Sequence, residues 1–169
     1  MIETSKYVII VMELVNGGSL YGLLKRQEGR RLKEDEAKRV FKQVVEAIRY
    51  CHNRCITHRD IKLENVLLDE QNNIKTIDFG FSTCIPNEKK VKIFCGTPSY
   101  MAPEIVQKTE YRGPPADIWA LGVLLFTMLC GCFPYKGSTD AELYAKISAA
   151  DYRIPSEAKL SKEATDLLS

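Results

Sequence analysis

His58-Arg59-Asp60-Ile61-Lys62-Leu63-Glu64-Asn65 gives the strongest indication of the fold. Two short motifs follow it along the chain, Asp78-Phe79-Gly80 and then Ala102-Pro103-Glu104. Taken singly, the polar residues have plain structural explanations, because Asp60 could shape a turn and Lys62 could be a solvated charge. The three motifs in this order and at this spacing are too specific a combination to be accidental.

These motifs resemble the H-R-D-L-x-x-x-N, D-F-G and A-P-E signatures of the eukaryotic protein kinases, which occur in the same order. The resemblance covers nearly the whole chain and implies an α+β, protein-kinase-like fold. That fold has a mainly α-helical C-terminal lobe with a hinge strand and small β-hairpins. We expect residues 1–169 to form a partial catalytic domain, cut short at both ends and with the N-terminal lobe largely missing.

The resemblance implies catalytic roles for Asp60, Lys62, Asn65 and Thr97. Phosphoryl transfer spreads negative charge over the γ-phosphoryl oxygens, so a kinase site must position its reactants and supply positive charge. Asp60 matches the residue that accepts or orients the proton of the attacking hydroxyl. Lys62 matches the lysine that reaches the transferred phosphate in serine/threonine kinases, and Thr97 matches the threonine that contacts both. Asn65 and Asp78 match the two Mg²⁺ ligands, whose hard oxygens suit a hard cation.

A second set of residues is implied around ATP. Met12 matches the gatekeeper beside the adenine pocket, and Leu67 matches the apolar residue beneath the adenine ring. The backbone of Glu13 and Val15 would pair with the adenine edge, since an unpaired amide and carbonyl suit that donor and acceptor pattern. Without the motifs, Met12 and Leu67 would be read equally well as core residues.

Ser19 and Glu64 complete the expected cofactor-binding set. Some kinases that prefer basic substrates carry Glu where this chain has Ser19, and there it serves both the ATP ribose and a substrate arginine. Ser19 can donate to a hydroxyl but cannot supply that charge. Glu64 is retained, so one acidic contact for a basic substrate residue stays available.

Three further residues are expected to support the site. His58 and Phe79 resemble two members of the packed column behind it. Asp117 resembles the carboxylate at a helix start that anchors the backbone of the catalytic loop, and a buried carboxylate there must find donors.

Hydrophobic spacing and turn residues predict the elements along the chain. Tyr7 to Leu14 reads as a buried strand closed by a turn at 16–18, and Ser19 can cap the helix that follows it. Residues 80–115 carry many glycines and prolines without sustained periodicity, so we expect an irregular segment there. The other expected elements are helices at 20–26, 33–52, 116–129, 138–149 and from about 161, and strands at 66–68 and 74–77.

Composition narrows the class of protein. Hydrophobic residues make up 45% and charged residues 27%, and the net charge of +2 favours neither nucleic acid nor an anionic membrane as a partner. The longest apolar run, Ile118 to Cys130, is shorter than the roughly 20 residues that span a bilayer and reads as a fully buried helix. The six cysteines form no C-x-x-C pair. We therefore expect reduced cysteines, no membrane segment and an intracellular, cytoplasmic location.

These features predict an ATP- and Mg²⁺-dependent protein serine/threonine kinase whose partners are ATP and Ser/Thr-containing proteins. The runs 78–82 and 94–98 resemble the calcium/calmodulin-dependent and AMP-activated (SNF1-like) group. No G-x-G-x-x-G motif and no V-A-I-K-type lysine precede the hinge, so we expect this 169-residue chain to be inactive alone. The alternatives are a pseudokinase or truncated lobe that binds proteins, and a small-molecule kinase, which the peptide-floor motif at 96–104 disfavours.

Overall fold

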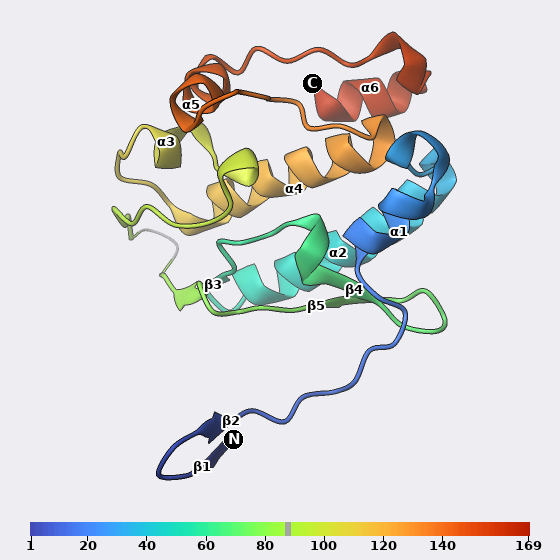
Figure 1. Cartoon of the computed structure of the whole chain (residues 1–169). Coiled ribbons are helices and arrows are strands. Elements are labelled where there is room, and N and C mark those ends of the chain that lie inside the picture. Colours follow the sequence, from blue (N-terminus) through green and yellow to red (C-terminus); the bar gives the residue numbers. More distant parts are fainter. Residues whose placement is uncertain (87–88) are drawn as a thin grey trace.

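The computed structural model describes residues 1–86 and 89–169 and shows helices packed around two central α-helices, with short antiparallel strand pairs beside them (Figure 1). The α-helices are α1 Leu20–Arg26, α2 Glu34–His52, α3 Pro103–Val106, α4 Gly113–Cys130, α5 Asp140–Ala149 and α6 Lys162–Leu168. The 3₁₀ turns are η1 Glu28–Arg30, η2 Leu63–Asn65, η3 Pro98–Tyr100 and η4 Ser156–Ala158. The strands are β1 Ile2–Glu3, β2 Val8–Ile9, β3 Ile56–Thr57, β4 Val66–Leu68, β5 Ile74–Thr76 and β6 Thr83–Cys84.

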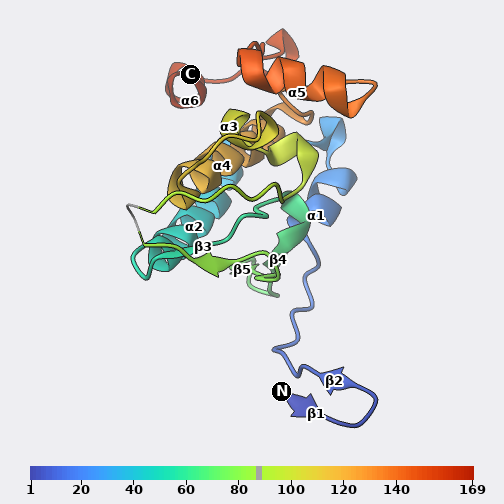
Figure 2. The ribbon, with the colours of Figure 1, turned by 90° about the vertical axis from the view of Figure 1, so that its left-hand side faces the viewer.

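The centre of the fold is the pair α2 and α4. Helix α2 places Ala37, Val40, Val44 and Ile48 on one buried face, at spacings of three and four, and carries three acidic residues in its first turn. Helix α4 is apolar almost all round and lies between α2 and the layer formed by α5 and α6 (Figures 1 and 2). Both helices therefore contribute apolar side chains to one core, and burial of that surface stabilises the fold.

Two strand pairs hold the ends of the catalytic loop, residues 58–65. Strand β3 pairs antiparallel with β6, and β4 pairs antiparallel with β5. The loop leaves β3 and returns through η2 directly into β4. Because both flanking strands are paired, the polar residues of the loop are presented from a fixed backbone.

The start of α4 approaches β3 so closely that only glycine fits. A Cβ atom on Gly113 would lie 2.1 Å from Oγ1 of Thr57, far inside van der Waals contact. Prolines follow Gly113 at the first helical positions, where a missing N–H costs no hydrogen bond. This close approach brings Asp117, one turn further along α4, to the catalytic loop.

The helix and hairpin predictions are confirmed within a few residues, and the boundaries differ where caps decide them. Helix α4 begins three residues before the expected start, at Gly113, and α5 begins at Asp140 because Thr139 caps it by accepting a hydrogen bond from the N–H of Glu142. Ser19 caps α1 as expected, by accepting from the N–H of Gly22 at 3.1 Å. The segment 80–115 is largely irregular, and its residues 87 and 88 lie outside the described residues.

The prediction of a buried strand over Tyr7 to Leu14 is wrong. Only Val8–Ile9 forms a strand, paired with Ile2–Glu3, and the segment extends away from the rest of the chain (Figures 1 and 2). Val11 is 75% exposed and Leu14 is 82% exposed. The apolar composition suits burial, but no described element of this chain covers the segment.

Helix α4 is long and apolar enough to cross a membrane by length and composition alone, but 72% of it is buried within the protein. That burial agrees with a core helix. The expectation of complete burial from Ile118 onward is wrong at its first residue, because Ile118 is 57% exposed on the face turned away from the core.

Candidate active site

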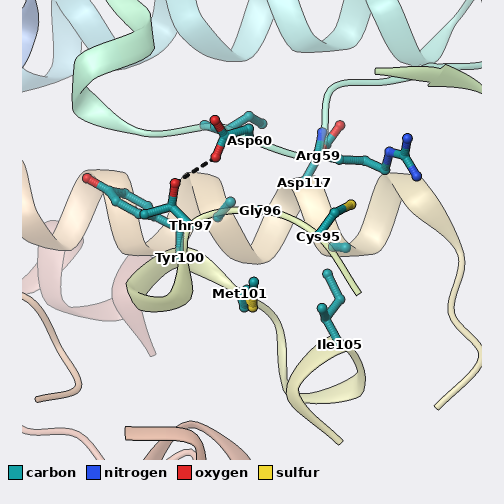
Figure 3. A pocket seen from close by; sticks show the side chains of 12 residues that line it. Arg59, Asp60, Cys95, Gly96, Thr97, Tyr100, Met101, Ile105 and Asp117 are labelled. Atoms are coloured by element: carbon teal, nitrogen blue, oxygen red, sulfur yellow. Dashed lines mark hydrogen bonds between the residues drawn. The ribbon is translucent and has the colours of Figure 1, made fainter. Parts of the chain in front are cut away.

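Three polar side chains, those of Lys62, Thr97 and Asn65, meet around the carboxylate of Asp60. Lys62 donates from Nζ to Oδ2 of Asp60 at 2.6 Å. The hydroxyl of Thr97 donates to Oδ1 of Asp60 at 2.7 Å, as Figure 3 shows. Lys62 also donates to Oγ1 of Thr97 at 3.1 Å, which closes a triangle of hydrogen bonds. Asn65 donates from Nδ2 to the backbone carbonyl of Asp60 at 2.8 Å and to its Oδ2 at 3.1 Å. The structure thus brings together all four residues predicted to be catalytic.

The environment of Asp60 favours its charged form. The side chain is almost fully buried, and this burial is the largest single influence and raises its pKa. Hydrogen bonds from Lys62, Thr97 and Asn65, together with the Lys62 charge, outweigh the burial and hold the pKa of Asp60 below its ordinary value of 3.8. At neutral pH the site therefore presents a carboxylate beside an ammonium group.

Asp117 of α4 holds the catalytic loop from behind. Its Oδ2 accepts from the backbone N–H of His58 at 2.9 Å, and its Oδ1 accepts from the N–H of Arg59 at 2.9 Å. The ring of His52 lies 2.8 Å from Oδ2. Asp117 is 1% exposed, so these donors replace the water that its carboxylate gives up on burial. The predicted anchor is confirmed.

Gly96 lets the loop that carries Thr97 approach the catalytic loop. Its φ of +110° lies in the left-handed region that favours glycine, and a Cβ atom there would lie 2.9 Å from the carbonyl oxygen of Arg59. A cavity of about 20 Å³, room for one water molecule, lies between these loops and α4 (Figure 3). Arg59 and Cys95 line it, and Nη1 of Arg59 is buried without a hydrogen-bond partner in the part of the chain that the structure describes.

Asp78 and Asn65 lie close together through the backbone. The N–H of Ile77 donates to the carbonyl of Asn65 at 2.9 Å, which brings the following Asp78 beside the catalytic loop. Asp78 has a φ of +64°, and Phe79 packs on the ring of His58 at 4.8 Å between centroids, as predicted for the supporting column. Backbone strain of this kind concentrates at functional sites.

The two predicted metal ligands fit Mg²⁺ by their chemistry. Asp78 supplies a solvent-exposed carboxylate, of which Oδ1 accepts from the N–H of Gly80 at 3.2 Å. The Asn65 side chain uses Nδ2 for both of its hydrogen bonds, and no hydrogen bond among the described residues uses its Oδ1. Mg²⁺ is commonly held by one or two such oxygens together with phosphate oxygens and water. Across residues 1–86 and 89–169, no cluster of three or more His, Cys, Asp or Glu side chains forms a metal cage.

The six residues expected around ATP lie in three places: beside β4, in the extended segment and in η2. Ser19 forms a backbone bridge with half-buried Leu67, so these two lie side by side next to β4. Met12 is 79% exposed, and Glu13 makes an exposed ion pair with Lys75 at 3.1 Å. The other two are half-buried Val15 in the extended segment and exposed Glu64 in η2.

Tyr100 is a site residue that sequence reasoning missed. Its phenolic oxygen accepts from the N–H of Leu63 at 3.3 Å, so it ties η3 to the catalytic loop. Burial is the main influence that raises the pKa of Tyr100, and the negative charges of Glu64 and Asp60 add to it. Tyr100 lies only three residues after Thr97 in the sequence, so it was a visible candidate. Its contact with the N–H of Leu63 forms only when the chain folds.

Comparison with known proteins identifies the family. The protein kinase domain matches residues 1–169. This chain belongs to the protein kinase family. This chain is 44% identical over 155 residues to NUAK family SNF1-like kinase 1 of both Mus musculus and Homo sapiens. It is 43% identical over 155 residues to the serine/threonine-protein kinase SIK3 homolog of Danio rerio.

These alignments cover 92% of this kinase domain but only part of each relative, 23% of NUAK family SNF1-like kinase 1 and 13% of the SIK3 homolog. They confirm the predicted resemblance to serine/threonine kinases and the SNF1-like group. They also confirm the protein-kinase-like fold, together with the helices and small antiparallel strand pairs described above.

Proposed function

We propose that the protein carrying this domain transfers the γ-phosphate of ATP to Ser or Thr hydroxyls of protein substrates. The observation that carries the proposal is the hydrogen-bonded group of Asp60, Lys62, Thr97 and Asn65. A buried carboxylate held by an ammonium group and a hydroxyl is suited to receive a proton beside a group that stabilises phosphoryl charge.

Each residue of the group has its own part in this proposal. Oδ1 or Oδ2 of Asp60 orients the substrate hydroxyl and takes up its proton. Lys62 stays within reach of the transferred phosphoryl group and supplies positive charge. Thr97 holds Asp60 and Lys62 in a fixed relative position, because its Oγ1 forms a hydrogen bond with each of them. Asn65 and Asp78 would hold Mg²⁺, which neutralises phosphate charge when it is bound.

The hinge segment, by which we mean the extended segment that carries Met12, Glu13 and Val15, has the parts of an adenine site but not their final arrangement. Met12, Glu13 and Val15 would border the adenine, Leu67 would lie beneath it, and Ser19 would contact the ribose. We infer that the 169-residue chain alone binds ATP weakly and has negligible activity, because Met12 and Glu13 lie exposed in this structure. We also propose an intracellular location, since ATP is available there.

The test is phosphate transfer from ATP with Mg²⁺ to a mixed peptide library. The full-length protein is compared with the 169-residue chain, and Asp60→Asn is made in both. We expect transfer to Ser and Thr by the full-length protein only, and a loss of about 10²–10⁴-fold in Asp60→Asn, the usual contribution of a positioned general base.

Thermal unfolding of the same proteins separates chemistry from folding. Asp60→Asn should melt close to the unaltered protein, because an amide keeps the size of the side chain and can still accept from Thr97. Transfer by the 169-residue chain alone would contradict the inferred inactivity. No transfer by either form would favour the second candidate, a kinase-like module that binds proteins through its exposed segment at 7–14.

A further inference from the structure

A pocket of about 310 Å³ lies between α1, the catalytic loop and the segment after α4. Its lining is cationic: Lys25, Arg30 and Lys136 contribute three positive charges. No Asp or Glu side chain lines it within the described residues. We refer to it as the cationic pocket. Its walls are apolar, formed chiefly by Tyr21, Leu63 and Phe133.

The three cations are available to a ligand. Lys25, Arg30 and Lys136 are exposed, and none of them makes an ion pair with another residue of the described ranges 1–86 and 89–169. Nζ of Lys25 lies 5.0 Å from the centroid of the Tyr21 ring, and the residue stays exposed to solvent. Three unpaired positive charges around one hollow create a local potential that attracts an anion.

The surrounding charges do not neutralise the cationic pocket. Glu28 belongs to the same turn as Arg30 but does not line the pocket. Glu142 is paired with Lys146 at 2.7 Å, and Lys146 also donates to the carbonyl of Lys136. Glu64 is exposed on the catalytic loop and lies outside the lining.

The cationic pocket adjoins the proposed site of phosphoryl transfer. Leu63 is both a wall of the pocket and a member of the catalytic loop, three residues after Asp60. Its N–H donates to Tyr100, and the Tyr100 ring packs edge-on against Phe133 at 5.3 Å between centroids. Tyr100 therefore contacts two residues that line the pocket, Leu63 and Phe133, and lies three residues after Thr97.

We propose that the cationic pocket binds an acidic side chain of the protein substrate, a short distance along the substrate from the hydroxyl that is phosphorylated. This proposal rests on the proposed kinase function. The guanidinium of Arg30 can pair with a carboxylate through two N–H groups, and Lys25 and Lys136 add unpaired charge. Tyr21 and Phe133 would pack against the methylene groups of the same side chain.

This pocket distinguishes substrates in a way that Glu64 alone would not. Glu64 is suited to a basic residue, whereas the cationic pocket is suited to an acidic one. A substrate of this domain is therefore expected to carry at least one acidic residue near its acceptor, whatever else it contains. Basic residues at the same position would be repelled.

The experiment measures kcat/KM of the full-length protein on Ser-containing peptides in which Glu, Ala or Lys is placed in turn at each position around the acceptor. We expect one position at which Glu exceeds Lys by about tenfold, the size expected for two or three exposed charge contacts. The double variant Lys25→Glu, Lys136→Glu should reverse that preference toward Lys. Equal use of Glu and Lys at every position would overturn the proposal.

A matched control variant carries the same change of charge elsewhere. Lys38 and Lys42 are exposed on α2, outside the cationic pocket, so the variant Lys38→Glu, Lys42→Glu should keep the preference for Glu. If this control also reverses the preference, the effect belongs to overall charge and the pocket is not the cause. Phosphoserine in place of Glu distinguishes a general anion site, used equally or better, from one shaped for carboxylates.

Fluorescence anisotropy measures peptide binding independently of phosphate transfer, so it tests the pocket and the proposed function separately. A labelled Glu peptide should bind the full-length protein more tightly than its Lys counterpart, and the double variant should reverse that order. If this is observed without any phosphate transfer, the kinase function fails and the cationic pocket stands. If transfer occurs with no charge preference in transfer or binding, the pocket fails and the kinase function stands.

Discussion

Two lysine–carboxylate pairs show how differently two regions of this molecule are built. In the catalytic loop, Lys62 and Asp60 are 2.6 Å apart, and their side chains are 21% and 2% exposed. Near the hinge segment, Lys75 and Glu13 are 3.1 Å apart, and their side chains are 44% and 66% exposed. The first pair is enclosed by further hydrogen bonds, whereas the second is surrounded by solvent.

The two parts of the proposed site therefore differ in what holds them in place. The groups proposed for phosphoryl transfer are held by α4 and the paired strands, all within this chain. Of the groups proposed around ATP, Met12, Glu13 and Val15 lie in the extended segment, whereas Ser19 and Leu67 are joined by a backbone bridge beside β4. The group around Asp60 is buried and held by its own hydrogen bonds, and such electrostatic interactions are stronger inside the protein than in water.

The largest effect is expected behind the catalytic loop. Asp117→Ala removes the acceptor of two buried backbone N–H groups and the partner of His52. We expect a loss of about 4 kcal/mol in the free energy of unfolding, typical for breaking a buried, hydrogen-bonded charge. Urea unfolding measures this loss. Asp166→Ala on exposed α6 is the matched control and should change stability by less than about 0.5 kcal/mol.

The comparison of the two ion pairs can be tested directly through activity. Lys62→Met in the full-length protein should lower kcat by about 100-fold or more, because it removes positive charge from the proposed transfer site. Lys75→Met should change kcat by less than about twofold, since an exposed pair contributes little. Steady-state kinetics on one peptide measures both. A similar loss of kcat in the two variants would show that the difference in burial between the two ion pairs does not decide their importance for activity.

A smaller loss of stability is expected from a change at Ser19. Ser19 caps α1 and bridges Leu67. Ser19→Ala should cost about 1 kcal/mol of stability, the usual value of a lost N-cap. Chemical denaturation gives the value, and Ser19→Asp is the control, because an aspartate can also accept from the N–H of Gly22. A loss in Ser19→Asp as large as in Ser19→Ala would argue against capping as the cause.

The smallest effect is expected in the exposed segment. Met12→Ala in the 169-residue chain should change its unfolding free energy by less than about 0.5 kcal/mol, since Met12 is 79% exposed. Leu124→Ala, at a core position with no exposure, should cost about 2–5 kcal/mol in the same chain. A comparable cost at both positions, measured by urea unfolding, would mean that the hinge segment packs in solution.

The helices and the candidate site were predictable from sequence for different reasons. Helix α2 was located within one residue because its apolar spacing and acidic first turn are local signals. The convergence of Asp60, Lys62 and Asn65 was predictable because they lie in one short loop and their motif is specific. The prediction of a buried strand over Tyr7 to Leu14 was wrong because apolar composition favours burial but does not provide another element of the chain to cover the segment.

Short motifs and local periodicity were enough to indicate the family, most of the helices and the side chains that we propose to be catalytic. Which distant residues meet depends on the tertiary structure. Thr97 reaches Asp60 across 37 residues, and Asp117 reaches the N–H of His58 across 59. The cationic pocket likewise joins Lys25 to Lys136. Such contacts depend on how helices and loops pack in three dimensions, and no local pattern specifies that packing.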